Sequence, residues 1–579
     1  MPELPIESAW CIASQRNSQV RELAEALRIP DYVARVLVNR GVADVEAGRR
    51  FLAPSASHLE DPFAFRQMDR AVARILQALE RGERIVVQGD YDVDGSAASA
   101  LLVNLFRLLG VEVTVSIPSR SGEGYGLNER IVRDAVAAGA RLMITCDNGT
   151  TALQPIAVAR ELGLDVIVTD HHTVGETLPD AYAVLNPHVK DETLRFRDLC
   201  GAGVAFKLAW AVLQRISRAP RMDQPFRDFL ASAQSLVALA SVADVVPLSG
   251  DNRVLTRMGL RLMPDNPNPG IRALLESSGV EGAPGGTDIG FKLAPRINAG
   301  GRLGRETLGL ELLTARSFGE AMELAREADA LNRKRQALDR ELTRLAEEMV
   351  QADAGYESER VLVLGHPEFH AGVVGIVAAR LCRRFNKPTV LVAVGAETAR
   401  GSGRSVAGFH LYNALNECSG LMQRFGGHAQ AAGLELDPRR LPELRREINR
   451  VADKHVTQAD YETPTLNIDA EVRLSALDPV GVRLLSELEP FGQGNPEPLF
   501  MAAGVEVASP PKVVGRGTGH LSLMLKQEGP ALKAIAFGAG SRVGEVARGT
   551  RLRVAYTPRI NSWRGIPEVE VEIKDFRPQ

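Results

Sequence analysis

The chain is poor in aromatic residues and has no excess of positive charge. Phe, Trp and Tyr together make up 5% of its 579 residues, and the formal net charge is −3 at pH 7. A protein that attracts nucleic acid through a global basic field, or holds it on many stacked aromatic rings, needs the opposite composition. Any polyanionic ligand must therefore be held by local clusters of basic side chains.

Disulfide, zinc-ribbon and membrane signals are also missing. The five cysteines are scattered and never form a CxxC pair, which disfavours disulfide bonds and a zinc ribbon. No apolar run reaches membrane-spanning length, and the first residues lack the basic and apolar regions of a signal peptide. We therefore expect a cytoplasmic protein with no membrane association.

The length and the residue pattern predict several α/β units. A chain of 579 residues exceeds what one hydrophobic core holds. From residue 84, short β-branched runs alternate with helical patterns, which predicts βαβ units and a parallel sheet. A long charged pattern without proline, from residue 320 to about 349, predicts one helix that bridges two domains. From about residue 466, about five short strands with turn signals predict a small barrel of the OB type.

The most informative stretch is the acidic loop at residues 89–95 (GDYDVDG), between a predicted strand and a predicted helix. Asp90, Asp92 and Asp94 stand at alternate positions, and their charges repel unless a cation neutralises them. The loop therefore predicts a divalent metal site. An EF-hand is excluded because Leu101 stands where the pattern requires Glu and because a strand precedes the loop. A solvated acidic turn without metal is the remaining alternative.

Polar residues also come directly after the next predicted strands. The strand at residues 142–146 leads into Asp147, and the strand at residues 166–169 leads into Asp170, His171 and His172. Because the carboxyl ends of parallel strands share one edge of a sheet, we expect these side chains to converge with the acidic loop.

Asp244, set in an apolar run, is a further candidate for this cluster. A lone buried Asp is more often a helix cap or an ion-pair partner, but its convergence with the other segments favours a ligand. Several carboxylates with a neutral imidazole fit Mn²⁺ better than an all-oxygen Mg²⁺ site, and Mg²⁺ stays open.

A second α/β domain is predicted from about residue 360, with two glycine-rich stretches that have the character of phosphate-binding turns. These are residues 400–405 (RGSGRS) and 426–433 (GGHAQAAG), where backbone N–H groups and the Ser and Arg side chains could contact an anion. An earlier stretch, residues 295–302 (PRINAGGR), predicts a glycine turn flanked by guanidinium groups. Residues 201–207 lack the complete glycine pattern of a nucleotide-binding motif, so a nucleotide cofactor is rejected.

These motifs, in this order, resemble the DHH phosphoesterases. The resemblance is carried by residues 89–95, 146–150, 170–172 and 243–244, and residues 426–433 resemble the companion DHHA1 motif. The stretch at residues 296–302, the FGQGNPE element at residues 491–497 and the terminal barrel are similar to the branch of this family that degrades single-stranded DNA.

The resemblance covers nearly the whole chain and implies a parallel-sheet DHH domain and a smaller α/β DHHA1 domain joined by a long helix, with a C-terminal OB-like barrel. The expected bounds are an N-terminal helical segment (1–80), the DHH catalytic domain (81–265), an Arg/Gly motif loop with the connecting helix (266–350), the DHHA1 domain (351–460) and the OB-like domain (461–579).

The resemblance also implies roles for individual residues. It assigns two divalent ions, Mn²⁺ or Mg²⁺, with Asp147 bridging them, to the ligands Asp92, Asp94, Asp147, His171 and Asp244. It gives supporting catalytic roles to Asp90 and Asp170, and it places His172 at the substrate phosphate. Gln88 stands where other branches carry a His ligand, which indicates a poorer metal site. The implied substrate contacts are Arg120, Arg302, Ser402, Arg404 and His428.

Basic and aromatic residues of the predicted barrel are further candidate contacts for a single strand. They are Lys512, Arg516, Arg559, Trp563 and Arg564. The alternative is that the barrel only braces the cleft or docks a partner protein.

The function implied is a metal-dependent 5′-to-3′ exonuclease that hydrolyses single-stranded DNA to 5′-mononucleotides by a two-metal-ion mechanism, in DNA recombination and repair. Single-strand-binding protein and a repair helicase are the expected partners, and a monomer is the expected state. One alternative is a DHH phosphodiesterase for short oligonucleotides or cyclic dinucleotides, which usually lacks the barrel. The other is a non-catalytic DNA-binding scaffold, which would be expected to lose carboxylates that this chain keeps.

Overall fold

The alternating pattern after residue 84 forms a five-stranded, all-parallel sheet in the computed structural model, which describes residues 9–14, 17–119, 126–217, 222–455, 465–515, 519–561 and 567–579. The strand order is β3-β2-β4-β5-β6. The strands are β2 (Arg84–Gln88), β3 (Thr114–Ser116), β4 (Ala140–Cys146), β5 (Asp165–Thr169) and β6 (Ala183–Leu185).

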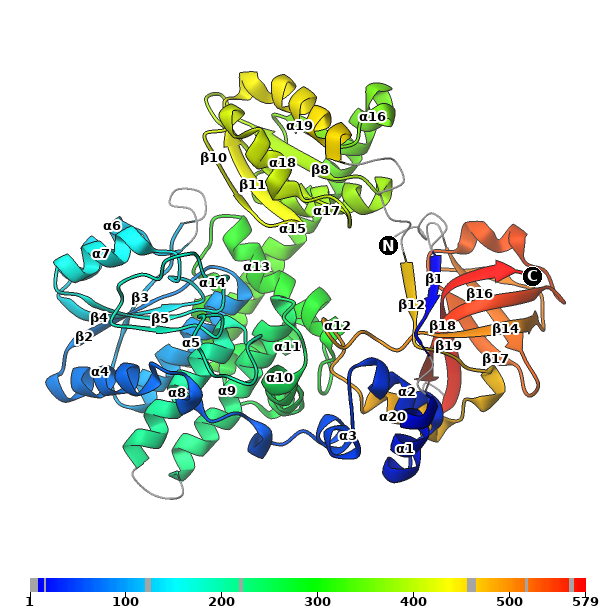
Figure 1. The fold of residues 1–579 in the computed structure, drawn as a ribbon, viewed down its shortest axis with the longest axis horizontal. Helices are drawn as coiled ribbons and strands as arrows, with labels where there is room; N and C mark the ends of the chain where they lie inside the picture. The colour runs from blue at the N-terminus through cyan, green and yellow to red at the C-terminus, as the bar shows by residue number, and fades with distance from the viewer. Residues whose placement is uncertain are drawn as a thin grey trace.

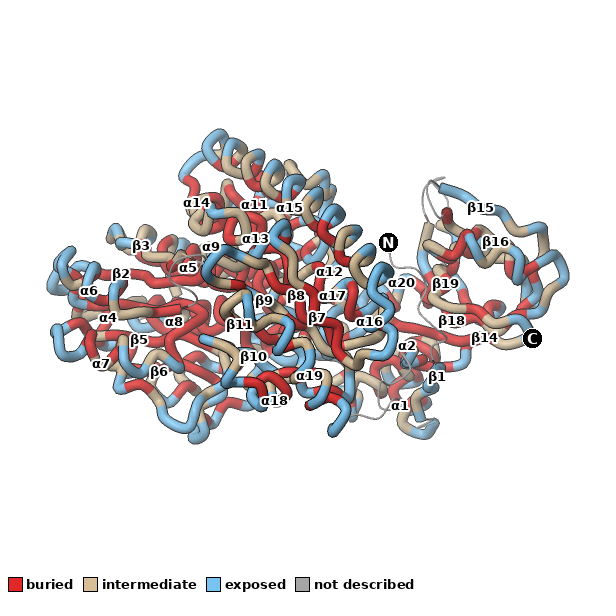
Figure 2. Tube along the Cα trace, turned by 90° about the horizontal axis from the view of Figure 1, so that it is seen from above, coloured by how far each residue is buried: buried red, intermediate tan, exposed pale blue. Residues whose placement is uncertain are grey.

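Helices cover both faces of this sheet, as the apolar, β-branched strands require. One set packs against the face formed by Ile85, Ile144 and Ile167, and it consists of α4 (Met68–Arg81), α5 (Val93–Leu108), α8 (Gly201–Ser217) and α9 (Gln224–Ala243). The opposite face, with Val86 and Met143, is covered by α6 (Glu129–Ala137) and α7 (Leu153–Glu161). Buried residues therefore run along the strands (Figure 2).

A helical layer completes the first α/β domain, which is the predicted catalytic domain and is called the catalytic body below. One long helix leaves it. The layer consists of α10 (Gly250–Leu262), α11 (Pro269–Ser278), α12 (Gly286–Asp288), the π-helical turn η4 (Ile289–Leu293), α13 (Ala294–Arg302) and α14 (Leu308–Thr314). The predicted bridging helix is confirmed as α15 (Phe318–Ala352), which runs to the second α/β domain (Figure 1).

The predicted glycine turn at residues 295–302 is wrong, because this stretch is helical in α13. Its glycines serve close packing instead. A Cβ at Gly301 would lie 2.9 Å from the Tyr91 ring, and a Cβ at Gly300 would lie 2.6 Å from the Arg305 carbonyl oxygen. The helix can therefore approach Tyr91 of the acidic loop closely only without a side chain at position 301, and the chain can fold back at Arg305 only without one at position 300.

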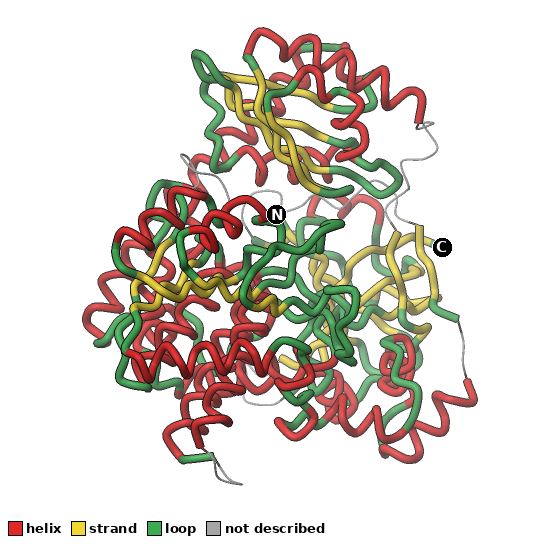
Figure 3. The backbone as a smooth tube through the Cα atoms, turned by 60° about the vertical axis from the view of Figure 1, so that its left-hand side comes forward, coloured by secondary structure: helices red, strands yellow, loops and turns green. Residues whose placement is uncertain are grey.

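The second α/β domain, at the top of Figure 3, has a five-stranded mixed sheet. Its strand order is β10-β11-β9-β8-β7. Its strands are β7 (Leu362–His366), β8 (Thr389–Val394), β9 (Ala399–Arg404), β10 (Arg424–Gly427) and β11 (Ala431–Leu436). Its helices are α16 (Gly355–Ser358), α17 (Val374–Phe385), α18 (Leu411–Glu417) and α19 (Leu441–His455).

Of the two predicted phosphate-binding turns, residues 400–404 form a strand, whereas residues 426–433 do contain a turn. Residues 400–404 belong to β9, which pairs with both β8 and β11, so the backbone groups are engaged in the sheet rather than turned toward an anion. Residues 426–433 form the ends of β10 and β11 and the short connection between them. The alternating glycines were misread because a turn and a central strand can carry the same small residues.

The predicted barrel is confirmed, and pairing of β14 with β16 closes it through β18, β19 and β17. This five-stranded closure is that of an OB-fold. The strands are β13 (Ala470–Glu471), β14 (Phe500–Val507), β15 (Lys512–Val514), β16 (His520–Lys526), β17 (Leu532–Ala536), β18 (Arg551–Asn561) and β19 (Glu568–Pro578), with α20 (Pro479–Ser486) between β13 and β14.

The N-terminal residues pack against this barrel and not against the catalytic sheet. β1 (Ala9–Ile12) pairs in parallel with β12 (Thr465–Ile468). The helices α1 (Asn17–Leu27), α2 (Asp31–Asn39) and α3 (Val45–Leu52) join the apolar core of the barrel, so the first described strand, β1, and the last strand, β19, lie at the same domain (Figure 1). In the part of the chain described, no helix combines the length and apolar character of a membrane span.

Candidate metal centre and substrate cleft

The predicted cluster of polar residues forms at the carboxyl edge of the parallel sheet. Asp92 caps α5 by accepting a hydrogen bond from the Gly95 N–H at 2.9 Å. Asp94 lies in the first turn of α5 and accepts hydrogen bonds of 2.7 Å from the backbone N–H groups of Gly201 and Ala202. These two donors begin α8, so the positive end of that helix faces the carboxylate.

His171 lies between carboxylates from three separate segments. Its Nε2 is 3.1 Å from Asp147 Oδ1 and 3.5 Å from both Asp94 Oδ2 and Asp244 Oδ2. Asp147 comes directly after β4 with φ of 62°, a left-handed conformation that costs energy outside glycine. Asp244 ends α9 as its C-cap. The expected convergence is therefore present.

The side chains form three overlapping groups whose potential ligand atoms lie within 4.8 Å of one another. The groups are Asp94–His171–Asp244, Asp147–His171–His172 and Asp90–Asp92–Asp147. Asp147 belongs to two of them, which fits a residue shared by adjacent cations. Asp90, expected only to support the ligands, also stands within ligand distance of this set. Carboxylates with imidazole suit Mn²⁺, and the oxygen-rich group also suits Mg²⁺.

The pKa values of these groups favour the binding of a cation. Burial, with the charges of Asp94 and Asp92, raises the pKa of Asp147 well above its ordinary value. Burial and the same two charges raise the pKa of Asp244 to about 8. Burial lowers the pKa of His171, which favours the neutral imidazole that binds metals. Without a cation, these carboxylates cannot all be ionised at neutral pH.

His172 has the opposite electrostatic setting. Its Nδ1 is 2.8 Å from Asp170 Oδ1. Burial alone would lower the pKa of His172, but the hydrogen bond and the charge of Asp170 outweigh it and raise the pKa to about 9. Asp170 also accepts hydrogen bonds from the N–H groups of Thr150 and His171. At neutral pH, His172 is therefore a half-exposed cation at the edge of the carboxylate cluster.

Asn186 is a positioning residue that the sequence did not reveal. Its buried side chain donates hydrogen bonds of 2.9 Å to the Thr150 hydroxyl and to the His172 carbonyl oxygen. It comes directly after β6, so the rule that located Asp147 and Asp170 would have found it had that short strand been recognised. Gln88 is buried and donates to the Gly89 carbonyl oxygen at 2.7 Å.

Three of the predicted phosphate contacts lie where the second α/β domain meets the catalytic body. Arg302, at the end of α13, donates to the Gly372 carbonyl oxygen at 3.1 Å. Arg404 donates to Ser402 Oγ at 3.0 Å. A Cβ at Gly375 would lie 2.9 Å from Ser402 Oγ, so this pair lies against the first turn of α17. A helix N-terminus with guanidinium and hydroxyl groups is suited to an anion.

The remaining predicted contacts are less well placed or cannot be placed. His428 lies in the connection between β10 and β11, and its backbone N–H bonds to the Ala431 carbonyl oxygen. Arg559 is paired with Glu497 at 2.6 Å and with Glu572 at 3.0 Å, so its guanidinium already serves the barrel. The residues that fall outside the described part of the chain are Arg120, Arg516, Trp563 and Arg564.

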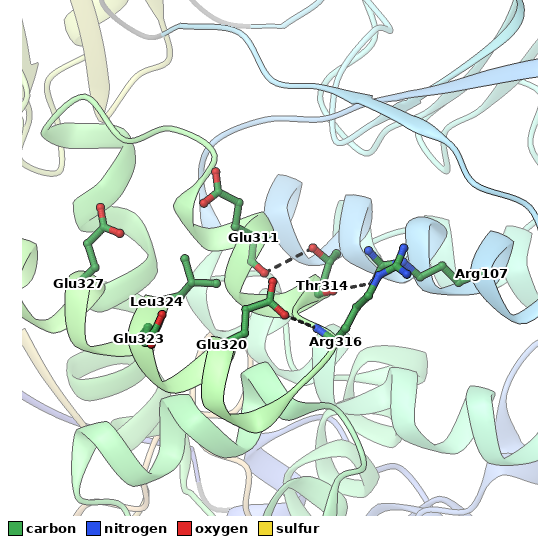
Figure 4. A pocket seen from close by; sticks show the side chains of 8 residues that line it. All are labelled: Arg107, Glu311, Thr314, Arg316, Glu320, Glu323, Leu324 and Glu327. Carbon is green, nitrogen blue, oxygen red and sulfur yellow. Dashed lines mark hydrogen bonds between the residues drawn. The ribbon is translucent and has the colours of Figure 1, made fainter.

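A separate hollow of about 390 Å³ lies between α5, α14 and α15 (Figure 4). Four glutamates and two arginines contribute to its lining, and Arg107 there donates to the Thr314 carbonyl oxygen at 2.6 Å. None of the clustered carboxylates lines it, and its excess of acidic groups does not suit a phosphodiester strand. The carboxylate cluster is therefore the better functional candidate.

Each of these parts matches a known family. Residues 84–234 match the DHH family, N-terminal domain, residues 358–454 match the DHHA1 domain, and residues 468–575 match the RecJ OB domain. The fold and the clustered carboxylates thus define a DHH-type phosphoesterase with a companion DHHA1 domain and an OB barrel.

Full-length relatives specify the family further. The chain is 36% identical to the single-stranded-DNA-specific exonuclease RecJ of Salmonella typhimurium, over 97% of this chain and 99% of that protein. It is 34% identical to RecJ of Bacillus subtilis, over 98% of this chain and 70% of that protein. The crystal structure of Thermus thermophilus RecJ in complex with Mn²⁺ superposes with a TM-score of 0.83 at 32% identity, covering 98% of this chain and 79% of that one. The chain belongs to the RecJ family.

Proposed function

We propose that the protein is a metal-dependent exonuclease that hydrolyses single-stranded DNA in the 5′-to-3′ direction to 5′-mononucleotides, in DNA recombination and repair. The observation that carries the proposal is the approach of Asp94, Asp147 and Asp244 to one imidazole nitrogen of His171. The relatives named as single-stranded-DNA-specific exonucleases match over nearly the full chain, which supports the substrate.

The proposed ligands of two divalent ions, Mn²⁺ or Mg²⁺, are Asp92, Asp94, Asp147, His171 and Asp244, with Asp147 shared. Bound ions of this kind activate water and stabilise the charge that develops on a phosphate. The side chains of the protein hold the ligands in place. The N-terminus of α8 fixes Asp94, and the Gly95 N–H fixes Asp92.

Around the ligands, the protein's own groups bind and orient the phosphodiester. Protonated His172, held by Asp170 and Asn186, contacts a non-bridging oxygen of the scissile phosphate. Arg302, Ser402 and Arg404 bind the terminal phosphate at the start of α17. A terminal phosphate held there would restrict cleavage to one end of the strand, so that the enzyme removes nucleotides from that end.

Two other functions compete with this one. A phosphodiesterase for short oligonucleotides or cyclic dinucleotides would not need the closed barrel, and a non-catalytic DNA-binding scaffold would not need five ligands around a shared site. We propose a cytoplasmic monomer that works with single-strand-binding protein and a repair helicase.

The test uses the full-length protein with Mn²⁺ and four substrates of matched sequence. Two are the same long 5′-phosphorylated single strand, labelled at its 5′ end or at its 3′ end. The others are a duplex and a dinucleotide. The proposal predicts stepwise release of mononucleotides from the 5′ end of the single strand and little attack on the duplex. Release from the 3′ end would reject the polarity, and preference for the dinucleotide would favour the small-substrate enzyme. Binding without hydrolysis at saturating Mn²⁺ would favour the scaffold.

A further inference from the structure

The chain is strained directly after Asp244. Val245 has φ of 60° and is 62% exposed. A β-branched residue in the left-handed region is a genuine outlier, and such a conformation costs about 1–3 kcal/mol. Exposure of Val245 means that its own side chain gains little burial in return. The strained conformation therefore has to be maintained by contacts of the neighbouring residues.

Pro247 and Leu248, just beyond Val245, are held by the domain that carries the barrel. The barrel turn, residues 491–495 between α20 and β14, lies against both of them. The Leu248 N–H donates to the Gln493 carbonyl oxygen at 2.8 Å. A Cβ at Gly492 would lie 2.7 Å from Leu248 Cδ1, and a Cβ at Gly494 would lie 3.3 Å from Pro247 Cβ. The turn thus packs closely against the segment after Asp244, most tightly at Gly492, where an added Cβ would have to displace the end of the Leu248 side chain.

The barrel turn is itself internally rigid. Gly492 and Asn495 exchange two backbone hydrogen bonds, of 2.9 and 3.2 Å. The buried Asn495 side chain donates at 2.8 Å to the carbonyl oxygens of Leu488 and Pro490. Gly494 has φ of 73°, a conformation that favours glycine. The turn is therefore rigid enough to fix the positions of Pro247 and Leu248, which lie against it.

Two arginines of the catalytic body hold the chain that leads into the turn. Arg253 donates to the carbonyl oxygens of Leu488 at 3.0 Å and Glu489 at 3.1 Å. Arg257 donates to the carbonyl oxygens of Glu487 and Glu489 at 2.5 Å. Both arginines lie on α10, which begins just after Leu248. The segment after Asp244 thus contacts the barrel turn directly through Leu248. The helix that follows this segment, α10, holds residues 487–489, which precede the turn.

We propose that the barrel turn is the positioning element for Asp244, so that the OB domain sets the affinity of one divalent-metal site in the catalytic domain. Contact of Gln493 and Gly492 with Leu248 fixes the chain beyond Val245, and the strained Val245 then holds Asp244 beside His171 and Asp94. If the contact is released, Val245 relaxes toward an ordinary conformation and Asp244 leaves the site. The inference rests on the proposed metal centre.

The test measures Mn²⁺ binding to the full-length protein by isothermal titration calorimetry, without DNA. Gly492→Ala places a Cβ against Leu248 Cδ1, and Asn495→Asp replaces the amide that bonds two carbonyl oxygens with a group that cannot donate. Each variant is expected to weaken one Mn²⁺ site by about 10- to 100-fold, as seen when a supporting contact of a metal ligand is lost, and to leave the other site unchanged.

The matched control is Gly544→Ala, in the same domain, where an added Cβ meets nothing within 4 Å. It is expected to bind Mn²⁺ as the unaltered protein does. A second arm combines Gly492→Ala with Leu248→Ala, which removes the methyl group in the way and is expected to restore most of the lost affinity. Thermal unfolding in EDTA separates this effect from a general loss of stability.

The outcomes are distinct. Weakened binding at one site, restored in the double variant, supports the inference. A lower unfolding temperature with unchanged Mn²⁺ affinity in both variants would overturn it and make the turn a structural contact only. If the unaltered protein bound no Mn²⁺, the proposed metal centre would fail, and with it the proposed function.

Discussion

At the scale of single residues, the metal centre is a site where function opposes stability. Asp147 is buried, has a left-handed backbone conformation and faces the charges of Asp94 and Asp92. Each of these properties costs free energy in the metal-free protein. A residue arranged so unfavourably is explained by a ligand that supplies the missing positive charge.

We therefore expect Asp147→Asn to separate stability from activity. The amide keeps the shape and cannot ionise, so the repulsion with Asp94 and Asp92 is removed and the metal-free protein should be more stable by about 1 kcal/mol. Hydrolysis should fall by more than about 100-fold, because a shared ligand is lost. Calorimetric unfolding in EDTA and a nuclease assay at saturating Mn²⁺ measure the two effects. Substantial residual hydrolysis would remove Asp147 from the shared position.

The pH dependence of the metal-free protein is expected to reflect Asp244. Burial beside Asp94 and Asp92 raises its pKa from 3.8 to about 8 on folding. Between these values the folded state keeps a proton that the unfolded state has lost, so this contribution to stability falls as the pH rises from about 4 to about 8. Mn²⁺ binds the ionised carboxylates, so its stabilising effect should grow over the same range.

The measurement is thermal unfolding at about pH 5 and about pH 8, in EDTA and in excess Mn²⁺. The difference between the Mn²⁺ and EDTA midpoints should be larger at the higher pH. Asp244→Asn serves as the control, since it removes the titrating group and should reduce the pH dependence. An equal Mn²⁺ effect at both pH values would contradict the raised pKa of Asp244.

At the scale of elements, the side chains that the sequence assigned to a phosphate-binding turn lie on a strand, beside the start of a helix. Ser402 and Arg404 stand on the same face of β9, two residues apart, and lie against the first turn of α17. A central strand holds side chains more rigidly than an exposed turn. The suggested terminal-phosphate site therefore combines the N-terminus of α17 with side chains from the adjacent strand.

Arg404→Ala should weaken the preference for 5′-phosphorylated over 5′-hydroxyl strands. Loss of one charge-assisted hydrogen bond costs about 1.5–3 kcal/mol, or roughly 10- to 100-fold. Arg383→Ala, at the other end of α17, removes the same charge from the same domain and should leave the preference unchanged. Competition between the two labelled strands gives the ratio. Equal loss on both strands in Arg404→Ala would make the residue structural or generally catalytic.

At the scale of the whole molecule, the net charge of −3 provides no attraction for a DNA strand. The basic residues of the barrel have to supply that attraction. The barrel is continuous with the N-terminal helices and is anchored to the catalytic body through Arg253 and Arg257. A strand bound to the barrel would thus be held in a fixed relation to the metal centre, which a flexibly tethered domain could not provide.

Reversing charge at Lys512 and Arg564 should therefore weaken the binding of long single strands and flatten its salt dependence by about 0.7 log units per log salt for each lost phosphate contact. Cleavage of a dinucleotide, which is too short to reach the barrel, should change little. Arg559→Gln is the comparison, because the two carboxylates that engage Arg559 make it a brace of the barrel. It should lower the unfolding temperature and keep the salt slope. Equal damage to long and short substrates by the charge reversals would mean that the barrel only supports the fold.

By itself, the sequence determined the elements whose pattern is local. The β-branched runs located β2, β4 and β5, and the rule that parallel strands share a carboxyl edge placed Asp94, Asp147 and His171 in one cluster. The uninterrupted charged pattern located α15, and the turn-separated short strands located the barrel. These properties depend on near neighbours in the chain, where spacing alone is informative.

Only the tertiary structure decided what depends on contacts between distant segments. Glycine permits a turn, a close helix packing or a central strand equally well, so residues 295–302 and 400–405 could be assigned only by what packs against them. For the same reason, the donors that α8 presents to Asp94 and the contact between Gly492 and Leu248 were not visible in the sequence. The free energy of these contacts comes from packing across the molecule, and no local pattern records it.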